Sequence, residues 1–469
     1  MNRPGTAAGL VPPAALVPAA RTRRPPLPGE PPALSVQDRI TLDLAGRGAD
    51  SAMHLGLVML LDGPPPTRRE LLAHVRGRLA AAPELTLLIG GPRARPRWVV
   101  DPAFDPGRHV HELVLAPGAP PGPDQVIAAV LDLPLPADRP RWGLWLVRPA
   151  EGDGYGLCYR AHHAFQDGTA AMGTVEELFG PGLPRQGPWP TPPPADARAD
   201  RPAPLAWLDA TTLRALLPRR REPARWSGLE RPLTGSRTAV TTSLELSRLH
   251  ALGRATGASV AQLCLAAATG TLRARHPLDW DAAAGRPGPV LHANLGIGLR
   301  DSDDALRLLG NRAGVLRIPL PCGEPHAPDR LEALRREVAP GRIAEIGRLH
   351  RTLFQRTPYR YARLGLRHSL DPRHTALSLA DVRLRRPLAF GAAPVHSTYP
   401  LPVSVPGQPL FIAWTADRRR LHVTFLADDA LTGAAELPAL WHRAVEELES
   451  TAGPARAHIP GGRERPPLG

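Results

Sequence analysis

Lysine is missing from this chain of 469 residues, whose 58 basic side chains are all arginines. Its absence excludes a lysine nucleophile and a phosphate-binding loop that depends on lysine. Cysteine is scarce as well: Cys158, Cys264 and Cys322 are too widely spaced for a disulfide framework, which fits a reducing cytoplasm. No stretch approaches about 18 consecutive apolar residues, so we expect no transmembrane helix.

Aromatic side chains make up only 4% of the chain, and five Tyr and seven Phe leave few rings for stacking on bases. No nucleic-acid-binding signature accompanies them, so we expect no nucleic-acid partner. The net charge of +14 and the pI near 11.0 favour an anionic partner, either a membrane surface or a phosphorylated co-substrate. An arginine-rich solvated surface would give the same composition.

Proline, with 58 residues, is abundant and divides the chain into segments. Such stretches cannot pack a core, so we predict a disordered leader at residues 1–32, a connector at 184–235 and a disordered tail at 456–469. The remaining segments, 33–183 and 236–455, are each long enough for a domain with its own core.

The string AHHAFQDGTAA, which begins at Ala161, holds two histidines, three further residues and an Asp-Gly pair. The preceding YGLCYRA is typical of a strand and the following TAAMGTVEELF of a helix. Strand side chains alternate between faces, so His162 and His163 point in opposite directions and only one can face a given pocket. A neutral imidazole there is suited to general-base chemistry near pH 7. A structural pair is the plain alternative; a metal site with Asp167 conflicts with the alternation.

Other elements of the second half follow from periodicity. The segment from Ser259 has apolar residues at helical spacing and a serine cap. PLFIAWTADRRRLHVTFLAD predicts a hairpin that turns at Asp417, and a further helix is expected over residues 434–448. Both halves therefore mix strands and helices.

HHxxxDG is the signature of an acyltransferase superfamily that includes chloramphenicol acetyltransferase and the condensation domains of peptide synthetases. This chain most resembles the bacterial wax ester synthase/diacylglycerol acyltransferases in that superfamily, and the resemblance covers roughly residues 33–450. It is carried by the motif and by the following segments: LSVQDRITLDLAG, AMHLGLVMLLDGPPP, RWVVDPAFDPGRHVHELVL, LPLPADRPRWGLWLV and LLGNRAGVLRIPLP.

The resemblance implies an α/β fold of two chloramphenicol-acetyltransferase-like sandwiches that form a pseudo-dimer, with a tunnel at their interface. It implies an acyl-CoA-dependent O-acyltransferase that passes a fatty acyl group to diacylglycerol or a fatty alcohol without a covalent acyl-enzyme. Acyl-CoA would be a co-substrate, and no cofactor would be bound permanently. Water-insoluble products further imply peripheral contact of a cytoplasmic protein with the inner membrane or with lipid droplets.

The resemblance also assigns roles within the motif. His163 takes the place of the general base, and His162 supports it from the opposite strand face. Gly168 allows a tight turn and close approach of the substrate chain. The donor that stabilises the oxyanion stays open between the Gly168 backbone and a side chain of the second half.

Asp167 resembles the family's structural aspartate, which points away from substrate and pairs with an arginine. The opening SVQDR offers Arg39 as that partner, so we predict a buried Asp167–Arg39 ion pair. Asn311, in the Gly-Asn segment, would order the tunnel wall or serve as a turn or cap residue.

The second half departs from the family's pattern. Ala261 and Gln262 stand in place of an Asn-Asp pair, and LADVRLRRPLAFG at residues 379–391 has lost the family's Gly-Pro turn. Arg141 and Gly143 replace a leucine and a glutamate in the first half. Two alternatives therefore remain: an O- or N-acyltransferase or condensation-like enzyme of specialised metabolism, and a non-catalytic acyl-binding relative.

Overall fold

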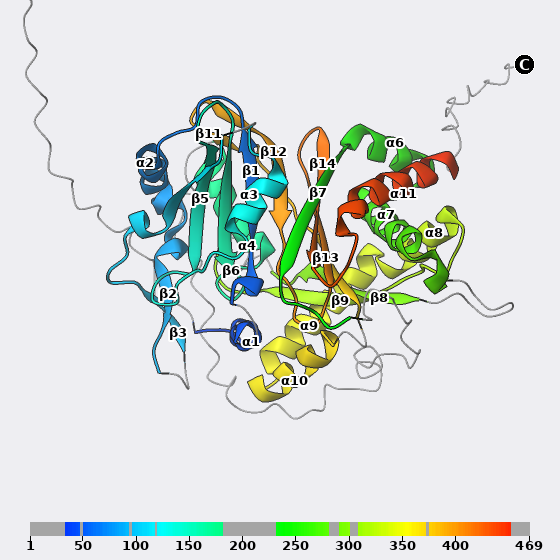
Figure 1. The fold of residues 1–469 in the computed structure, drawn as a ribbon. Helices are drawn as coiled ribbons and strands as arrows, with labels where there is room; N and C mark the ends of the chain where they lie inside the picture. Colours follow the sequence, from blue (N-terminus) through cyan, green and yellow to red (C-terminus); the bar gives the residue numbers. More distant parts are fainter. Residues whose placement is uncertain are drawn as a thin grey trace, which may run out of the picture.

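The computed structural model describes residues 33–46, 50–92, 96–117, 120–181, 231–280, 290–300, 308–371 and 375–451. The predicted leader, nearly all of the predicted connector and the predicted tail lie outside these residues. Two six-stranded sheets stand side by side, each covered by helices, so the expected pair of α/β sandwiches is present (Figure 1).

The first sandwich has the strand order β11-β12-β1-β6-β5-β4. Its side chains alternate between two cores: Leu157 and Tyr159 of β6 pack with α2 and α4, whereas Cys158 packs with α3 on the other face. Its elements are α1 (Val36–Ala45), β1 (His54–Leu61), α2 (Arg68–Arg78), the β2–β3 pair (Leu87–Gly90 and Arg97–Val100), β4 (Val110–Leu115), α3 (Pro123–Val130), β5 (Trp142–Pro149), β6 (Tyr155–His162) and α4 (Gly168–Phe179).

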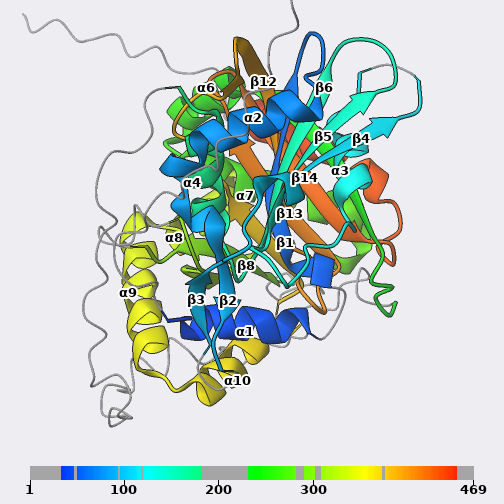
Figure 2. The ribbon, with the colours of Figure 1, turned by 90° about the vertical axis from the view of Figure 1, so that its left-hand side faces the viewer.

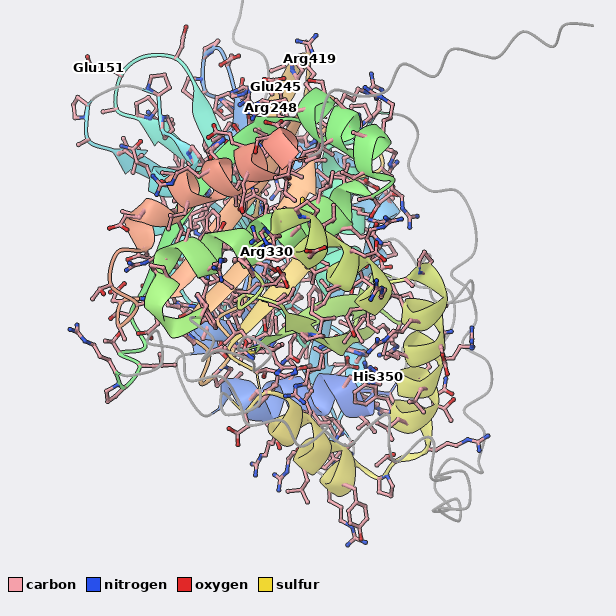
Figure 3. All side chains as sticks on the ribbon, turned by 90° about the vertical axis from the view of Figure 1, so that its right-hand side faces the viewer. Glu151, Glu245, Arg248, Arg330, His350 and Arg419 are labelled. Carbon is pink, nitrogen blue, oxygen red and sulfur yellow. The ribbon has the colours of Figure 1, made fainter. Side chains whose placement is uncertain are left out.

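The second sandwich has the strand order β7-β14-β13-β10-β8-β9. The helices α7, α8 and α11 pack together against this sheet, and buried Arg330 of α8 donates to the Glu324 and Pro325 carbonyls (Figure 3). The second half of the chain supplies these elements and also β11 and β12 of the first sheet. In chain order they are β7 (Arg237–Glu245), α6 (Leu246–Thr256), α7 (Val260–Arg275), β8 (Leu291–Gly298), β9 (Ala313–Leu320), α8 (Ala327–Glu337), α9 (Pro340–Arg356), α10 (Tyr359–Ser369), β10 (Leu377–Asp381), β11 (Ala389–Phe390), β12 (Ala393–Leu401), β13 (Leu410–Ala416), β14 (Arg420–Asp428) and α11 (Leu437–Thr451).

The elements predicted from local patterns are confirmed. The Ser259 side chain accepts the Gln262 N–H and caps α7. β13 and β14 form the expected hairpin, in which Asp417 Oδ1 accepts the Arg419 and Arg420 N–H groups at 2.7 Å. The helix expected at 434–448 is a short 3-10 turn followed by α11. The periodic spacing of hydrophobic side chains was sufficient to locate these elements.

No single helix in the described ranges is long and apolar enough to cross a bilayer. The helices α6 and α7 meet that test of length and composition only as a pair, and the pair is bent by 98°. The apolar residues of α7 from Leu263 to Leu272 are buried in the core of the second sandwich.

The sheets do not follow the chain's division into halves. β11 and β12, residues 389–401, leave the second half and join the first sheet, where Val58 of β1 lies opposite Tyr399. Residues 308–312 also cross over, and Gly310 forms a bridge with Gln166. The boundaries 33–183 and 236–455 therefore describe chain order but not sheet membership, because the edge of β1 is completed by a strand from the far end of the sequence.

We predict that Gly56→Ala destabilises the fold. Gly56 lies in β1 between two paired strands, and a Cβ there would be 1.9 Å from the Tyr159 carbonyl oxygen, so the backbone would have to move. We expect a loss of about 1–3 kcal/mol in the free energy of unfolding. The matched control, Gly77→Ala in α2, has open space around its Cβ and should stabilise slightly. Equal unfolding midpoints for the two variants in urea would contradict the prediction.

Candidate active site

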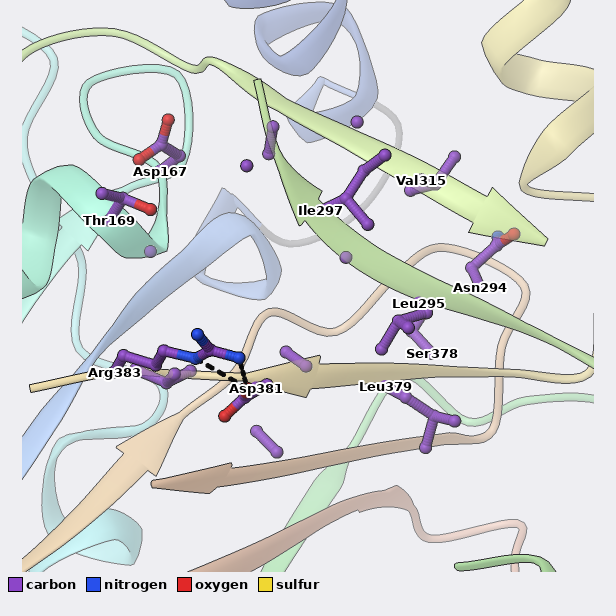
Figure 4. Close-up of a pocket in the computed structure, with 18 of the residues that line it drawn as sticks. Asp167, Thr169, Asn294, Leu295, Ile297, Val315, Ser378, Leu379, Asp381 and Arg383 are labelled. Atoms are coloured by element: carbon purple, nitrogen blue, oxygen red, sulfur yellow. Dashed lines mark hydrogen bonds and ion pairs between the residues drawn. The ribbon is translucent and has the colours of Figure 1, made fainter. Parts of the chain in front are cut away.

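A cavity of about 2510 Å³ lies between the two sandwiches. Drug-sized ligands occupy about 300–1,000 Å³, so this space can hold two long molecules at once. His163, Asp167 and Gly168 lie on its wall, and Figure 4 shows Asp167 and Thr169 facing strands of the second sheet. Apolar side chains from both sandwiches supply much of the rest, among them Met53, Leu55, Met172, Leu265, Ile297 and Phe354.

The two motif histidines lie in different surroundings, as the strand alternation predicts. His162 is the last residue of β6 and is fully buried. His163 begins the turn after the strand, is half-buried and lies on the cavity wall. Its N–H donates to the Met53 carbonyl oxygen at 2.8 Å, which fixes the backbone just before the turn.

The surroundings of His163 keep its ring neutral. Burial lowers the pKa of His163 below its usual value, although the residue's own carbonyl and the carboxylates of Asp167 and Asp38 act in the opposite direction. A neutral ring at pH 7 can accept a proton from a bound hydroxyl. The site residue predicted to be the base is therefore in a state that suits that role.

A carboxylate that the sequence analysis missed lies beside His162. Its Nδ1 accepts the Ala164 N–H at 3.0 Å, so the ring proton is on Nε2. Nε2 lies 3.6 Å from Asp50 Oδ1, and Asp50 also contacts His54 Nε2 at 3.1 Å and the guanidinium of Arg141. Asp50 belongs to the same 3-10 turn as Met53, so one short turn supports both histidines.

A buried arginine, Arg160, contacts the other ring nitrogen of His54. Arg160 Nη2 donates to His54 Nδ1 at 2.8 Å, and the guanidinium also donates to carbonyl oxygens of the segment after α3. Burial would raise the pKa of Asp50, but the His54 hydrogen bond and the Arg141 charge lower it to about 2. Burial lowers the pKa of His54 to about 4. At pH 7 Asp50 is therefore an anion and His54 is neutral.

Asp167 pairs with Arg300, and the predicted partner Arg39 was wrong. Arg300 Nη2 lies 2.9 Å from Asp167 Oδ2, and the two side chains are 6% and 3% exposed. The Asp167 carboxylate also accepts the N–H groups of Ala170 at 2.8 Å and Arg312 at 2.7 Å. Burial would raise its pKa, but the Arg300 charge and these hydrogen bonds lower it.

The rotation of α1 explains the misassignment. Successive helical residues differ by about 100°, so adjacent side chains of the SVQDR segment point to different neighbours. The Arg39 guanidinium lies 4.2 Å from the centre of the Tyr359 ring on α10. Asp38 is the buried one: it accepts the Asn311 N–H at 2.7 Å and lies 3.7 Å from Arg312. The opening helix thus contributes a carboxylate to the site, not a guanidinium.

Asn311 combines the two roles that were left open. Its Nδ2 donates to Thr41 Oγ1 at 3.0 Å, and its Oδ1 accepts the Ala313 N–H at 2.9 Å. It also lies on the cavity wall. The side chain therefore joins α1 to the start of β9, next to the place where Gly310 bonds to the motif turn.

The metal alternative for the motif lacks a geometric basis. Among the described residues, no group of three or more His, Cys, Asp or Glu side chains is arranged to hold an ion. His162 is directed toward Asp50, whereas Asp167 is engaged with Arg300.

The departures in the second half have structural partners. Gln262 Oε1 accepts the Ser259 N–H at 2.9 Å and so serves the cap of α7. In the 379–391 segment, Arg383 pairs with Asp381 (Figure 4), and Arg386 reaches Glu177 of α4 at 2.8 Å. Ion pairs to the first sandwich therefore hold a segment that lacks the family's Gly-Pro turn.

We predict that Asp167→Asn destabilises the protein by about 3–5 kcal/mol at pH 7, because the buried Arg300 guanidinium loses the carboxylate that lies 2.9 Å from it. The pKa of Asp167 is lowered by folding, so its contribution is complete above the unfolded value near 3.8 and is lost as the pH falls through the folded value. Unfolding in urea at pH 7 and near pH 3 measures both. Asp62→Asn, at a side chain 91% exposed, is the control.

The same experiment separates the two candidate partners. Arg300→Gln should reproduce most of the loss, whereas Arg39→Gln should lose only its contact with Tyr359. A large loss for Arg39→Gln together with a small one for Arg300→Gln would overturn the assignment.

Comparison with known proteins agrees with the motif. Residues 34–217 match the family model of the wax ester synthase/diacylglycerol acyltransferase catalytic domain. A probable diacylglycerol O-acyltransferase of Mycobacterium tuberculosis is 29% identical over 131 residues, which are 26% of this chain and 27% of the relative. A putative diacylglycerol O-acyltransferase of the same species is 33% identical over 85 residues, 18% of each chain. The matched segments thus span about a quarter or less of these curated relatives.

The fold is similar to solved structures over almost the whole chain. The wax ester synthase/diacylglycerol acyltransferase from Marinobacter aquaeolei VT8 has a TM-score of 0.61 at 20% identity and covers 91% of this chain and 100% of its own. The first condensation domain of the CDA synthetase has a TM-score of 0.63 at 19% identity, with 91% and 97% covered. The expected two-domain, chloramphenicol-acetyltransferase-like fold is confirmed. The first half of this chain is similar to the catalytic domain of the wax ester synthase/diacylglycerol acyltransferase family, and the chain as a whole has the fold of the solved structure from Marinobacter.

Proposed function

We propose that this chain is an acyl-CoA-dependent O-acyltransferase that transfers a fatty acyl group to the hydroxyl of diacylglycerol or a fatty alcohol. The observation that carries the proposal is the placement of His163: a neutral imidazole on the wall of a large, mainly apolar cavity between two sandwiches. The catalytic-domain match over residues 34–217 supports the same reaction class. The two alternatives, an enzyme of specialised metabolism and a non-catalytic acyl-binding protein, have less support because the relatives above carry acylglycerol-synthesis names.

In the proposed reaction His163 acts as base and then as acid. It takes the proton of the acceptor hydroxyl while the oxygen attacks the thioester carbonyl carbon. The tetrahedral intermediate collapses, the C–S bond breaks, and the imidazolium returns the proton to the leaving thiolate. An ester and free coenzyme A result, and no acyl group is attached to the protein.

The oxyanion donor is proposed to come from the start of α4. Asp167 caps this helix by accepting the Ala170 N–H, and the N–H groups of Gly168 and Thr169 have no acceptor within the helix. Gly168 and Thr169 bring this helix end to the cavity wall. Amide hydrogens at such an end, together with the helix dipole, stabilise a developing negative charge.

Acyl-CoA as donor is supported by a structural relative. The starter condensation domain of rhizomide synthetase, solved in complex with C8-CoA, has a TM-score of 0.62 at 18% identity over 91% of this chain. The excess of arginine suits a phosphorylated co-substrate. No permanently bound cofactor is part of the proposal, which places the protein in the cytoplasm with peripheral contact to membrane or lipid droplets.

We predict that His163→Ala lowers kcat by about 10²–10⁴-fold, the usual contribution of a positioned general base. The assay uses purified protein, labelled palmitoyl-CoA and a panel of diacylglycerol, fatty alcohols and amines. His396→Ala, at an exposed histidine of β12, is the control and should leave the rate unchanged. The wild-type rate should fall with acid as His163 becomes protonated, below its usual pKa of 6.5. Full activity of His163→Ala with loss in His162→Ala, or transfer only to amines, would contradict the proposal.

We predict that Arg141→Leu lowers kcat about 10- to 100-fold with little change in KM, because Arg141 helps hold Asp50 and, through it, His162 beside the base. Burial is the main cause of the lowered pKa of His162, and the Arg141 charge lowers it further. Removing that charge should therefore raise the pKa of His162, so that protonation of His162 adds to the loss of rate at low pH. Arg148→Leu in β5, at a residue whose partner is Glu112, is the control. Identical pH profiles for the two variants would exclude this positioning role.

A further inference from the structure

Two of the three large hydrophobic side chains that are most exposed in the described ranges lie on one helix. Tyr361 and Leu364 of α10 are 53% and 57% exposed, and Val114 of β4 is 53% exposed. Tyr361 and Leu364 are three residues apart, so they project from the same side of the helix. Single exposed apolar residues are common on protein surfaces, so the pair gains its meaning from the charges around it.

The chain around this pair is strongly basic. Between residues 340 and 371 there are seven arginines against one glutamate and one aspartate. The Arg360 guanidinium lies 4.7 Å from the centre of the Tyr361 ring, so charge and apolar surface are directly adjacent. Helices with apolar side chains flanked by arginines are typical of those that lie in the interface of an anionic bilayer. The arginines are Arg342, Arg348, Arg351, Arg356, Arg360, Arg363 and Arg367.

The same two helices also form part of the cavity wall. Ala362 and Leu366 of α10 line the cavity, as do Leu353, Phe354 and His350 of α9, the last labelled in Figure 3. Figures 1 and 2 both show α9 and α10 together at one end of the molecule, beside α1. Tyr361 is itself among the residues that line the cavity, so the exposed pair adjoins it.

We propose that α10, with the adjoining end of α9, docks on the surface of an anionic phospholipid bilayer. Leu364 and Tyr361 enter the interface, and Arg360 contacts lipid phosphates, whereas Arg342 and Arg363 are paired with Glu337 and Asp43. A lipid acceptor would then leave the bilayer next to the helices that wall the cavity. This last step rests on the proposed acyltransferase function, whereas docking itself does not.

The test is co-sedimentation of the full chain with vesicles of phosphatidylcholine alone and with phosphatidylglycerol added. We expect binding to the anionic vesicles, which falls as salt screens the charges. Leu364→Ser should weaken it about tenfold, and Val114→Ser, with the same exposure on β4, should not. Arg360→Gln should weaken it about fivefold, and Arg69→Gln, exposed on α2, should not. Because all four side chains are exposed, their replacement should leave the unfolding midpoint unchanged.

Three results would overturn the docking proposal. The first is equal binding to neutral and anionic vesicles, and the second is an equal loss of binding for Leu364→Ser and Val114→Ser. The third is that the protein does not bind vesicles but forms a dimer that Leu364→Ser dissociates. A separate assay with short-chain acyl-CoA and a water-soluble alcohol measures the chemistry alone. Leu364→Ser should retain wild-type rates there and lose rate only with acceptors embedded in vesicles. A loss of rate in both assays would show that the substitution damages the enzyme itself. If neither the wild type nor any variant is active, the proposed function is rejected, and the vesicle-binding result still decides the docking proposal.

Discussion

The carboxylate of Asp167 is the point on which both sandwiches depend. It caps α4 of the first, and it accepts hydrogen bonds from Arg300 and from the Arg312 backbone in the chain that leads into β9 of the second. Burying an anion so completely is costly unless several donors face it. Because those donors come from residues far apart in sequence, the turn that follows His163 can keep its shape only when the two sandwiches are assembled. The site is therefore a property of the interface.

A second carboxylate, that of Asp50, organises the surroundings of the histidines, as Asp167 organises the turn. It lies in one short 3-10 turn with Met53, whose carbonyl holds the His163 backbone, and it faces both His54 and His162. Two positively charged groups flank these residues: Arg141 contacts Asp50, and Arg160 donates to His54. Removing water from such a network strengthens each bond within it, which makes the arrangement rigid when every member is present.

Local patterns located most of the helices and strands, because the periodicity of buried side chains and the caps are written in consecutive residues. They also placed His162 and His163 on opposite faces. They could not locate the crossing of β11 and β12 or the partner of Asp167, since these depend on contacts between segments more than 100 residues apart. Arg39 was chosen for its place in a familiar segment, although one step of helix rotation directs it to Tyr359 and gives Asp38 the buried position. The HHxxxDG motif does not include His54 or Asp50, so it could not predict that they lie beside His162.

The exclusive use of arginine has a structural counterpart at two positions. The Arg160 guanidinium serves four acceptors, His54 Nδ1 and the carbonyl oxygens of Val130, Leu131 and Leu133. An ammonium group has three donors on one nitrogen, whereas a guanidinium spreads five over a plane. Arg300 similarly spans the Asp167 carboxylate and the Gly310 carbonyl. At these buried sites lysine could not make the same contacts, while on α10 the positive charge near the surface is what matters, and either cation would supply it.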